Sequence, residues 1–146
     1  MTSVHRTFTA DVPLEAVVGY LRDFAHAESW DPGTVTCTQN GAGMPCVGTT
    51  WHNVSEFRGR RTELTYELTY ADPHRLTFVG KNKTATSTDD MTFESLGDKT
   101  SITYKATVKF NGLAKLADPI MKREFEKLAD QIVELMPRTL EALPRS

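Results

Sequence analysis

Apolar and polar residues alternate along most of the chain up to residue 110, and a period of two predicts β-strands. In the clearest segment, Tyr104, Ala106 and Val108 share one face while Lys105, Thr107 and Lys109 take the other. One apolar and one polar face are typical of an antiparallel sheet with one side in water. The pattern predicts seven strands, which contain Val4–Ala10, Thr34–Asn40, Val47–Phe57, Leu64–Tyr70, Leu76–Gly80, a sixth segment from Asn82 or Lys83 to Glu94 or Ser95, and Ile102–Phe110.

Turn-forming residues separate these segments. Gly, Pro, Asn and Asp favour turns because they tolerate or impose backbone angles that strands do not use. Such groups lie between the strands, as Asn40-Gly41-Ala42-Gly43, Arg58-Gly59-Arg60, Asp72-Pro73-His74 and Gly97-Asp98.

Two short helices are expected between the first and second strands. Asp11 and Pro13 are typical of a helix start, and apolar residues then recur at helical spacing to about Arg22. A second short helix is predicted at Phe24–Glu28, which Pro32 ends.

The end of the chain is predicted to be one helix of about 18 to 25 residues, roughly 27 to 37 Å long. Asp118 suits the N-cap and Pro119 the first helical position. Pro137 is expected to kink or end this helix, with Leu140 and Leu143 extending it beyond a kink. The apolar stripe that should face the sheet is Met121, Phe125, Leu128, Ile132 and Leu135.

Strands grouped apart from helices indicate an α+β fold rather than a βαβ array. The predicted architecture is a seven-stranded curved antiparallel sheet wrapped around a long C-terminal helix, with two short helices between strands 1 and 2. The 146 residues fit one domain spanning 1–146.

This order of elements resembles the helix-grip fold of the START-like superfamily (SRPBCC), which includes polyketide cyclase/dehydrase-like proteins. The resemblance covers nearly the whole chain, and it implies a pocket for lipids, polyketides or similar molecules, with catalysis in only some members. It rests on Phe8-Thr9-Ala10-Asp11-Val12-Pro13, Asp23-Phe24, Trp30-Asp31-Pro32, Val47-Gly48-Thr49-Thr50-Trp51, Asp72-Pro73 and Leu76-Thr77-Phe78.

A bent sheet and one helix meet imperfectly, so we expect an apolar space between them. Leu68, Val108 and Leu128 are expected deeper in the core. The aromatic side chains either line the space or pack on one another, and a buried Tyr hydroxyl or Trp N–H needs a partner that a ligand can supply. The expected lining is Trp51, Tyr66, Phe78, Tyr104, Met121 and Phe125.

Strand parity places polar residues on the inward register. Asp89 shares its face with Met91 and Phe93, while Asn53 shares the face of Trp51. In one arrangement Asp89, with Asn53, Ser55 or Arg6, orients a polar group of a ligand. In the other, which we prefer, the strand starts or bulges near Thr88 and leaves Asp89 at a wet rim.

The histidines and cysteines give little support for a reactive centre. His26 lies in the short-helix region and is a candidate ligand contact, whereas His5, His52 and His74 should face water. No spacing predicts a metal site, and no phosphate or dinucleotide motif predicts a cofactor. Cys37 and Cys46 are expected to be free thiols.

The charge and hydropathy pattern argues against nucleic acid and membrane as partners. The net charge is −2 with both signs mixed, which predicts no nucleic-acid partner. Arg58, Arg60 and Arg61 sit beside acidic residues and should form a solvated hairpin end. No segment has the apolar length for membrane insertion, and a cytoplasmic location is the expectation.

Three functions compete. The first is a protein that binds a small hydrophobic or aromatic molecule. The second is a polyketide cyclase/aromatase- or dehydratase-type enzyme, for which Asp89, Arg6, Tyr66 and Tyr104 form the credible set. The third is a toxin-like or stress-response protein-interaction role. Such a role would require an exposed apolar or basic patch, and the outward face of the predicted sheet, which is rich in Thr, Lys and Glu, does not offer one. The pattern predicts neither the ligand's identity nor the oligomeric state.

Overall fold

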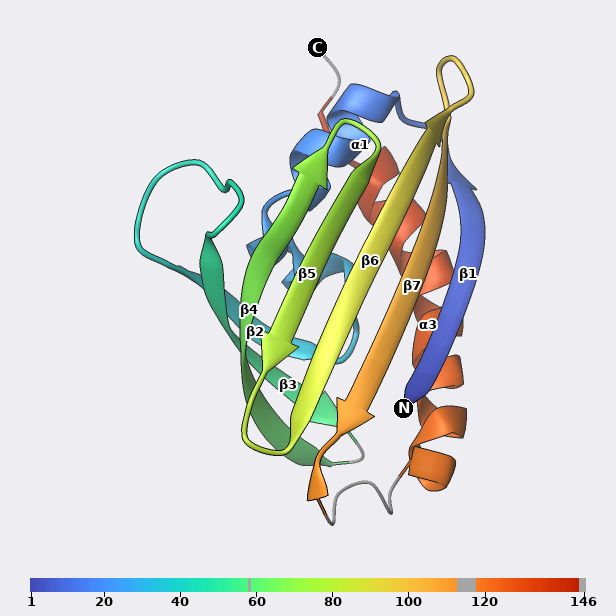
Figure 1. Ribbon diagram of the computed structural model, residues 1–146. Helices are drawn as coiled ribbons and strands as arrows, with labels where there is room; N and C mark the ends of the chain where they lie inside the picture. Colours follow the sequence, from blue (N-terminus) through green and yellow to red (C-terminus); the bar gives the residue numbers. More distant parts are fainter. Residues whose placement is uncertain (58, 113–117, 145–146) are drawn as a thin grey trace.

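The structure, a computed structural model, describes residues 1–57, 59–112 and 118–144. Within these residues seven antiparallel strands form one sheet in the order β1-β7-β6-β5-β4-β3-β2 (Figure 1). The first strand therefore pairs with the last. The strands are β1 (Thr2–Ala10), β2 (Thr34–Asn40), β3 (Thr50–Phe57), β4 (Arg60–Asp72), β5 (Arg75–Lys81), β6 (Ala85–Ser95) and β7 (Thr100–Phe110).

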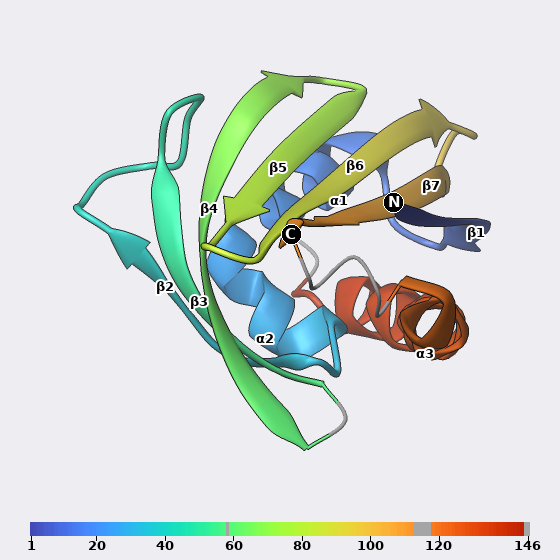
Figure 2. The ribbon, with the colours of Figure 1, turned by 60° about the horizontal axis from the view of Figure 1, so that its bottom comes forward.

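The helices lie on the concave side of the curved sheet (Figure 2). Between β1 and β2 the chain forms α1 (Leu14–Leu21), the 3-10 helix η1 (Phe24–His26) and α2 (Ala27–Trp30), and the long α3 (Asp118–Glu141) comes last. η1 and α2 contact β2, whereas α3 lies beside β1 (Figure 2). The predicted α+β fold is confirmed.

α3 begins at Asp118, as predicted, and continues for 24 residues through Pro137. Proline has no N–H to donate, but the helix does not end there. Its buried face differs from the predicted stripe, because Met121, Phe125, Leu128 and Leu135 are only partly buried and Ile132 alone of the five is buried. The buried residues are Ala129, Ile132, Met136 and Leu140.

Two strand boundaries differ from the prediction. β3 starts at Thr50 rather than Val47, because Gly48 adopts a left-handed φ of 100° and Val47 remains 56% exposed in the preceding loop. β6 starts at Ala85, because the Asn82 side chain accepts hydrogen bonds from the amides of Thr84 and Ala85 and closes a turn there. Each difference reflects local turn chemistry.

A β-bulge in β4 corrects a further expectation. The register between β4 and β5 shifts between Leu68 and Tyr70, so Tyr70 turns outward and is 46% exposed. The unbroken alternation predicted through Tyr70 is therefore wrong beyond Leu68, and Ala71 takes the inward position beside the core.

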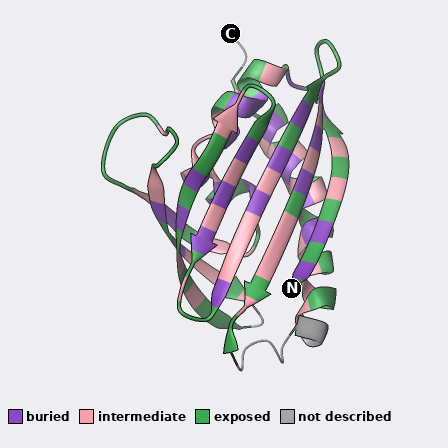
Figure 3. Cartoon of the chain, viewed as in Figure 1, coloured by how far each residue is buried: buried purple, intermediate pink, exposed green. Residues whose placement is uncertain are grey.

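Elsewhere buried and exposed positions alternate along the strands (Figure 3). Pairing extends this alternation across the sheet, so inward residues form continuous rows. One row contains Val4, Ala106, Asp89, Phe78 and Leu68.

An aromatic cluster fills the concave face under η1 and α2. The Phe24 ring is its centre, with ring centroids 4.4 Å from Phe78 and 4.6 Å from Tyr66. Edge contacts to two tryptophans, at 6.0 and 6.1 Å, complete the packing. We use "aromatic cluster" for Phe24, Trp30, Trp51, Tyr66 and Phe78, all of which are buried.

Gly80 makes room for Tyr66 within this cluster. Gly80 pairs with Tyr66 of β4 and with Ser87 of β6. A Cβ atom added at Gly80 would lie 2.6 to 2.7 Å from three ring carbons of Tyr66, closer than packed atoms tolerate. The phenol ring therefore lies across the glycine and reaches towards β6.

We predict that Gly80→Ala lowers the free energy of unfolding by about 1–3 kcal/mol, because the Tyr66 ring must leave its position. Urea denaturation measures the change. Gly19→Ala is the matched control: Gly19 lies in α1 with open space where the alanine methyl group would sit, so alanine should stabilise by about 0.5–1 kcal/mol. Equal effects at the two glycines would contradict the placement of Tyr66.

Candidate functional site

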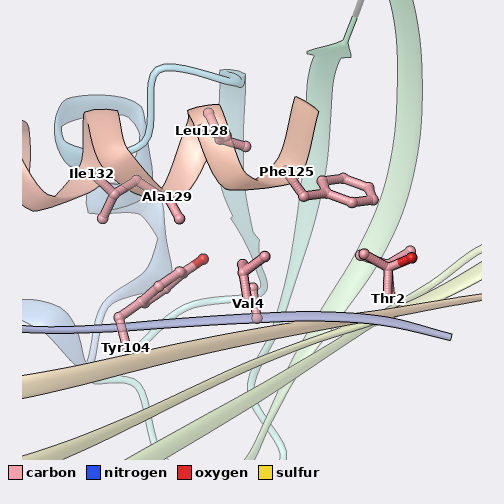
Figure 4. A pocket seen from close by; sticks show the side chains of 9 residues that line it. Thr2, Val4, Tyr104, Phe125, Leu128, Ala129 and Ile132 are labelled. Carbon is pink, nitrogen blue, oxygen red and sulfur yellow. The ribbon is translucent and has the colours of Figure 1, made fainter. Parts of the chain in front are cut away.

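A small cavity lies between the sheet and α3 (Figure 4). Side chains from α3 point towards β1 and β7, and the enclosed volume is about 20 Å³. That volume holds about one water molecule, whereas ligand pockets typically measure about 300–1,000 Å³. The wall consists of Thr2, Val4, Tyr104, Ala106, Val108, Phe125, Leu128, Ala129 and Ile132.

A larger hollow of about 310 Å³ lies on the outer side of β6 and β7. Its wall is mostly polar and open to solvent, with Thr92, Glu94, Ser101 and Thr103 beside one aromatic ring. Among the described residues no buried reactive group faces it, so the cavity under α3 is the better candidate site.

Asp89 is buried on the inner face, close to the wall of this cavity. Its side chain is 4% exposed, and its partner across the strands is Ala106 of the wall. The preferred interpretation, a wet rim, is wrong, because β6 begins at Ala85 and pairs with β7 in unbroken register to Ser95. The Tyr104 hydroxyl donates a hydrogen bond to Asp89 Oδ2 at 3.0 Å.

Burial changes the acid–base behaviour of Asp89. The pKa of its carboxyl is raised from 3.8 to about 7, because desolvation by burial and, to a smaller extent, the negative charge of Asp31 outweigh the lowering effect of the Tyr104 hydrogen bond. Burial and the neighbouring acids also raise the pKa of Tyr104 well above 10. Asp89 can therefore bind or release a proton near neutral pH, while Tyr104 stays a neutral donor.

Tyr66 and Ser87 extend this polar group along the inner face. The hydroxyls of the two residues hydrogen-bond, which lowers the pKa of Tyr66, although burial and the charge of Asp89 raise it well above 10 overall. We use "inner polar group" for Ser87, Asp89, Tyr66 and Tyr104, which come from β6, β4 and β7.

Asp31 follows α2 and adds a second carboxyl near the inner polar group. It accepts hydrogen bonds from the Gly33 amide at 2.9 Å and from the Thr34 hydroxyl at 3.0 Å. Burial raises its pKa, and these two donors lower it. Its charge raises the pKa of both Asp89 and Tyr104, so the three groups form one electrostatic unit.

Several predicted lining residues lie in the packed core instead of at the cavity. Trp51 and Phe78 belong to the aromatic cluster, and Trp51 Nε1 donates to Asp23 Oδ1 at 3.1 Å. Asn53 is buried, and its side-chain oxygen accepts a hydrogen bond from the Ser55 hydroxyl at 2.6 Å. That oxygen is thus satisfied within the protein.

Of the predicted helix contacts, Phe125 lines the cavity and Met121 does not. Phe125 also stacks on Phe57 of β3, with ring centroids 5.0 Å apart. Val108 and Leu128, which we expected deeper in the core, form part of the wall.

Arg6 and His26 lie away from the inner polar group. Arg6 is on the inward register but donates to Asp130 Oδ1 of α3 at 2.9 Å, at the edge of the sheet. His26 stacks on Tyr20 with centroids 3.9 Å apart and hydrogen-bonds the Tyr20 carbonyl oxygen. The fold does not bring Asp89 together with Arg6, Asn53 or Ser55.

Three residues that shape the site were missed by sequence reasoning. Phe24 and Trp30 fill the concave face, and Asp31 adds charge. Spacing alone marks the segment Trp30-Asp31-Pro32 as a helix end. The sequence signal that could have identified these residues is an aromatic residue next to an acidic one at a helix end. Local spacing, however, does not show where in the fold such a pair will lie.

Both cysteines are free thiols, as predicted. Cys37 is buried and Cys46 exposed, and burial raises the pKa of Cys37 to about 12. In the described part of the chain, no three His, Cys, Asp or Glu side chains gather as metal ligands would. No helix there combines the length and apolar character needed to cross a membrane.

Comparisons with known proteins agree with this architecture. Residues 1–141 match the model of a family described as polyketide cyclase / dehydrase and lipid transport. Among curated protein sequences, none matches the chain.

Solved structures share the fold at low sequence identity. A START superfamily protein from Mycobacterium smegmatis has a TM-score of 0.78 and 15% identity, covering 99% of this chain and 100% of its own. The Zhui aromatase/cyclase from Streptomyces sp. R1128 has a TM-score of 0.71 and 14% sequence identity, and the match covers 95% of this chain and 90% of that protein. The di-domain ARO/CYC StfQ from the steffimycin biosynthetic pathway gives 0.73 and 10%, covering 96% of this chain and 50% of its own. Such identities establish a shared fold alone.

We predict that Asp89→Asn stabilises the protein increasingly as pH rises. The folded state holds the Asp89 proton more tightly than the unfolded chain does, so wild-type stability falls from pH 3.8 to about 7 and is constant above. The difference should reach about 4 kcal/mol, because each pKa unit corresponds to about 1.4 kcal/mol. Urea denaturation from about pH 4 to 8 measures it.

The control for this series is Asp98→Asn, because Asp98 lies exposed in the turn between β6 and β7. Its effect on stability should not vary across the window. A pH-independent difference for Asp89→Asn as well would contradict a proton held inside the fold.

Proposed function

Because this chain belongs to the polyketide cyclase / dehydrase and lipid transport family, we propose that it binds a small hydrophobic or aromatic molecule between the sheet and α3. The observation that carries the proposal is the placement of Tyr104. Its side chain forms part of an otherwise mostly apolar cavity wall and also holds the buried carboxyl of Asp89. A polar pair at an apolar cavity is suited to orienting one end of a guest.

The apolar residues of the cavity wall provide the favourable free energy of binding. Val4, Val108, Leu128 and Ile132 offer aliphatic surface, and Phe125 adds a ring. A guest that hides roughly 300 Å² of apolar surface gains about 7 kcal/mol before the cost of association. Binding of this kind needs no cofactor and no metal.

A guest must open the site before it can enter. The cavity of about 20 Å³ is far smaller than any aromatic molecule, and its wall residue Phe125 is held in a stacked contact with Phe57. α3 packs along the edge strand β1, and its N-terminal half carries the wall residues Phe125 and Leu128. Displacement of Phe125 is the smallest rearrangement that enlarges the space, and its energetic cost lowers the apparent affinity.

A second candidate function is proton-transfer catalysis of the cyclase or dehydratase type. One observation favours it: Asp89 has a pKa of about 7 and accepts a hydrogen bond from Tyr104, which is the property of a general acid or base at neutral pH. Mass spectrometry of bound molecules separates the two functions, since a carrier returns its guest unchanged and a dehydratase returns it without one water.

We predict that Phe125→Ala binds the uncharged fluorescent probe N-phenyl-1-naphthylamine roughly 2- to 10-fold more tightly than the wild type does. The variant no longer has to break an aromatic contact, which is worth about 0.5–1.5 kcal/mol. Fluorescence titration measures the dissociation constants.

Leu96→Ala is the control, because Leu96 is 53% exposed in the β6–β7 turn, away from the wall residues. It should leave probe affinity unchanged. Failure of the probe to bind either the wild type or Phe125→Ala would contradict the proposed function, and weaker binding by Phe125→Ala would contradict entry by displacement of this ring.

A further inference from the structure

The inner face under α3 carries acids and hydroxyls, and no described cation acts on them. The charges that act on Asp89, Tyr66 and Tyr104 come from acidic neighbours, chiefly Asp31 and Asp89 itself. The side chains that α3 directs towards the cavity are apolar. Charged residues of α3 pair elsewhere, with Lys127 on Glu124 at 3.9 Å and Asp130 on Arg6.

Arg6, on the inward register of β1, already has hydrogen-bond partners within the protein. Arg6 donates to Asp130 Oδ1 at 2.9 Å and to the His5 carbonyl oxygen at 2.8 Å. A carboxylate guest would therefore meet acids at the inner polar group. Arg22, at the C-terminal end of α1, has a buried Nε without a hydrogen-bond partner, but it is not among the groups that shift the pKa of Asp89, Tyr66 or Tyr104. An uncompensated charge in an apolar interior is strongly unfavourable.

Uncharged polar groups, in contrast, are present on the inner face. Tyr66, Ser87 and Tyr104 carry hydroxyls whose oxygens can accept hydrogen bonds, while the Tyr104 proton is donated to Asp89. Within the described chain, Trp30 Nε1 is a buried nitrogen without a hydrogen-bond partner, and the Trp30 ring meets the Tyr104 ring edge-on with centroids 5.9 Å apart. Leaving a buried N–H unpaired is unfavourable, and an oxygen of a guest would supply the missing acceptor.

We infer that the guest presents a hydroxyl or carbonyl oxygen and carries no negative charge, so that the site rejects carboxylates such as free fatty acids. This inference rests on the proposed function and narrows it. The oxygen meets the inner polar group and the Trp30 N–H, while the apolar body of the guest lies against the α3 side chains. The site discriminates against carboxylates because it offers them no counter-charge. Guests of the same shape can therefore differ in affinity.

Two probes of one size test this inference by isothermal titration calorimetry at about pH 6, where the buried carboxyl is largely protonated: 2-naphthol and 2-naphthoate. We expect 2-naphthol to bind at least tenfold more tightly than 2-naphthoate. Naphthalene, which has the same rings without oxygen, serves as the apolar reference. Equal or tighter binding of 2-naphthoate would overturn the inference and leave the proposed function standing, whereas failure of all three compounds to bind would overturn both.

Tyr104→Phe tests the oxygen contact separately. This variant should reduce the affinity ratio of 2-naphthol to naphthalene at least threefold, because the hydroxyl that organises Asp89 is gone. Naphthalene affinity reports any general damage to the site, so the ratio remains interpretable. An unchanged ratio would overturn the role of the inner polar group in recognition.

Discussion

The burial of one carboxyl group on the concave face of an apolar sheet is the constraint on which the site depends. Asp89 lies in a row of inward residues between Ala106 and Phe78, where a hydrophobic side chain would pack without a desolvation penalty. The Tyr104 hydroxyl offsets part of that penalty, but the carboxyl still holds its proton up to about pH 7. A group that destabilises the fold at neutral pH fits a role in function better than a role in stability.

The concave face divides into a packed part and an adaptable part. Under η1 and α2, the rings around Phe24 pack on one another, with centroids 4.4 and 4.6 Å from Phe78 and Tyr66. Under α3, small and aliphatic side chains leave a small cavity whose wall includes Phe125, which stacks on Phe57. Tyr104 links the two parts, since its ring contacts Trp30 and also lines the cavity.

The fold could be predicted well because period-two alternation, turn residues and one long amphipathic segment are local signals. Strand parity also placed Asp89 on the inner face, and the rim alternative failed because no bulge interrupts β6. The failures have nonlocal causes. The bulge after Leu68 turns Tyr70 outward, and Phe24 enters the concavity from a short helix whose position depends on tertiary packing. The hydrogen-bond partner of Asp89 is Tyr104, not Asn53 or Arg6. Residue spacing could not predict this, because it does not show which side chains are long enough to meet across neighbouring strands.

The most direct test of the account is a carbon-detected NMR titration of the Asp89 carboxyl in the unmodified protein, assigned by comparison with Asp89→Asn. The account predicts a pKa of about 7, because the carboxyl is buried beside a second acid and no described cation offsets the two charges. A midpoint near the ordinary value of 3.8 would mean that water reaches Asp89, and it would contradict the dry inner face from which the proposed function and its selectivity follow.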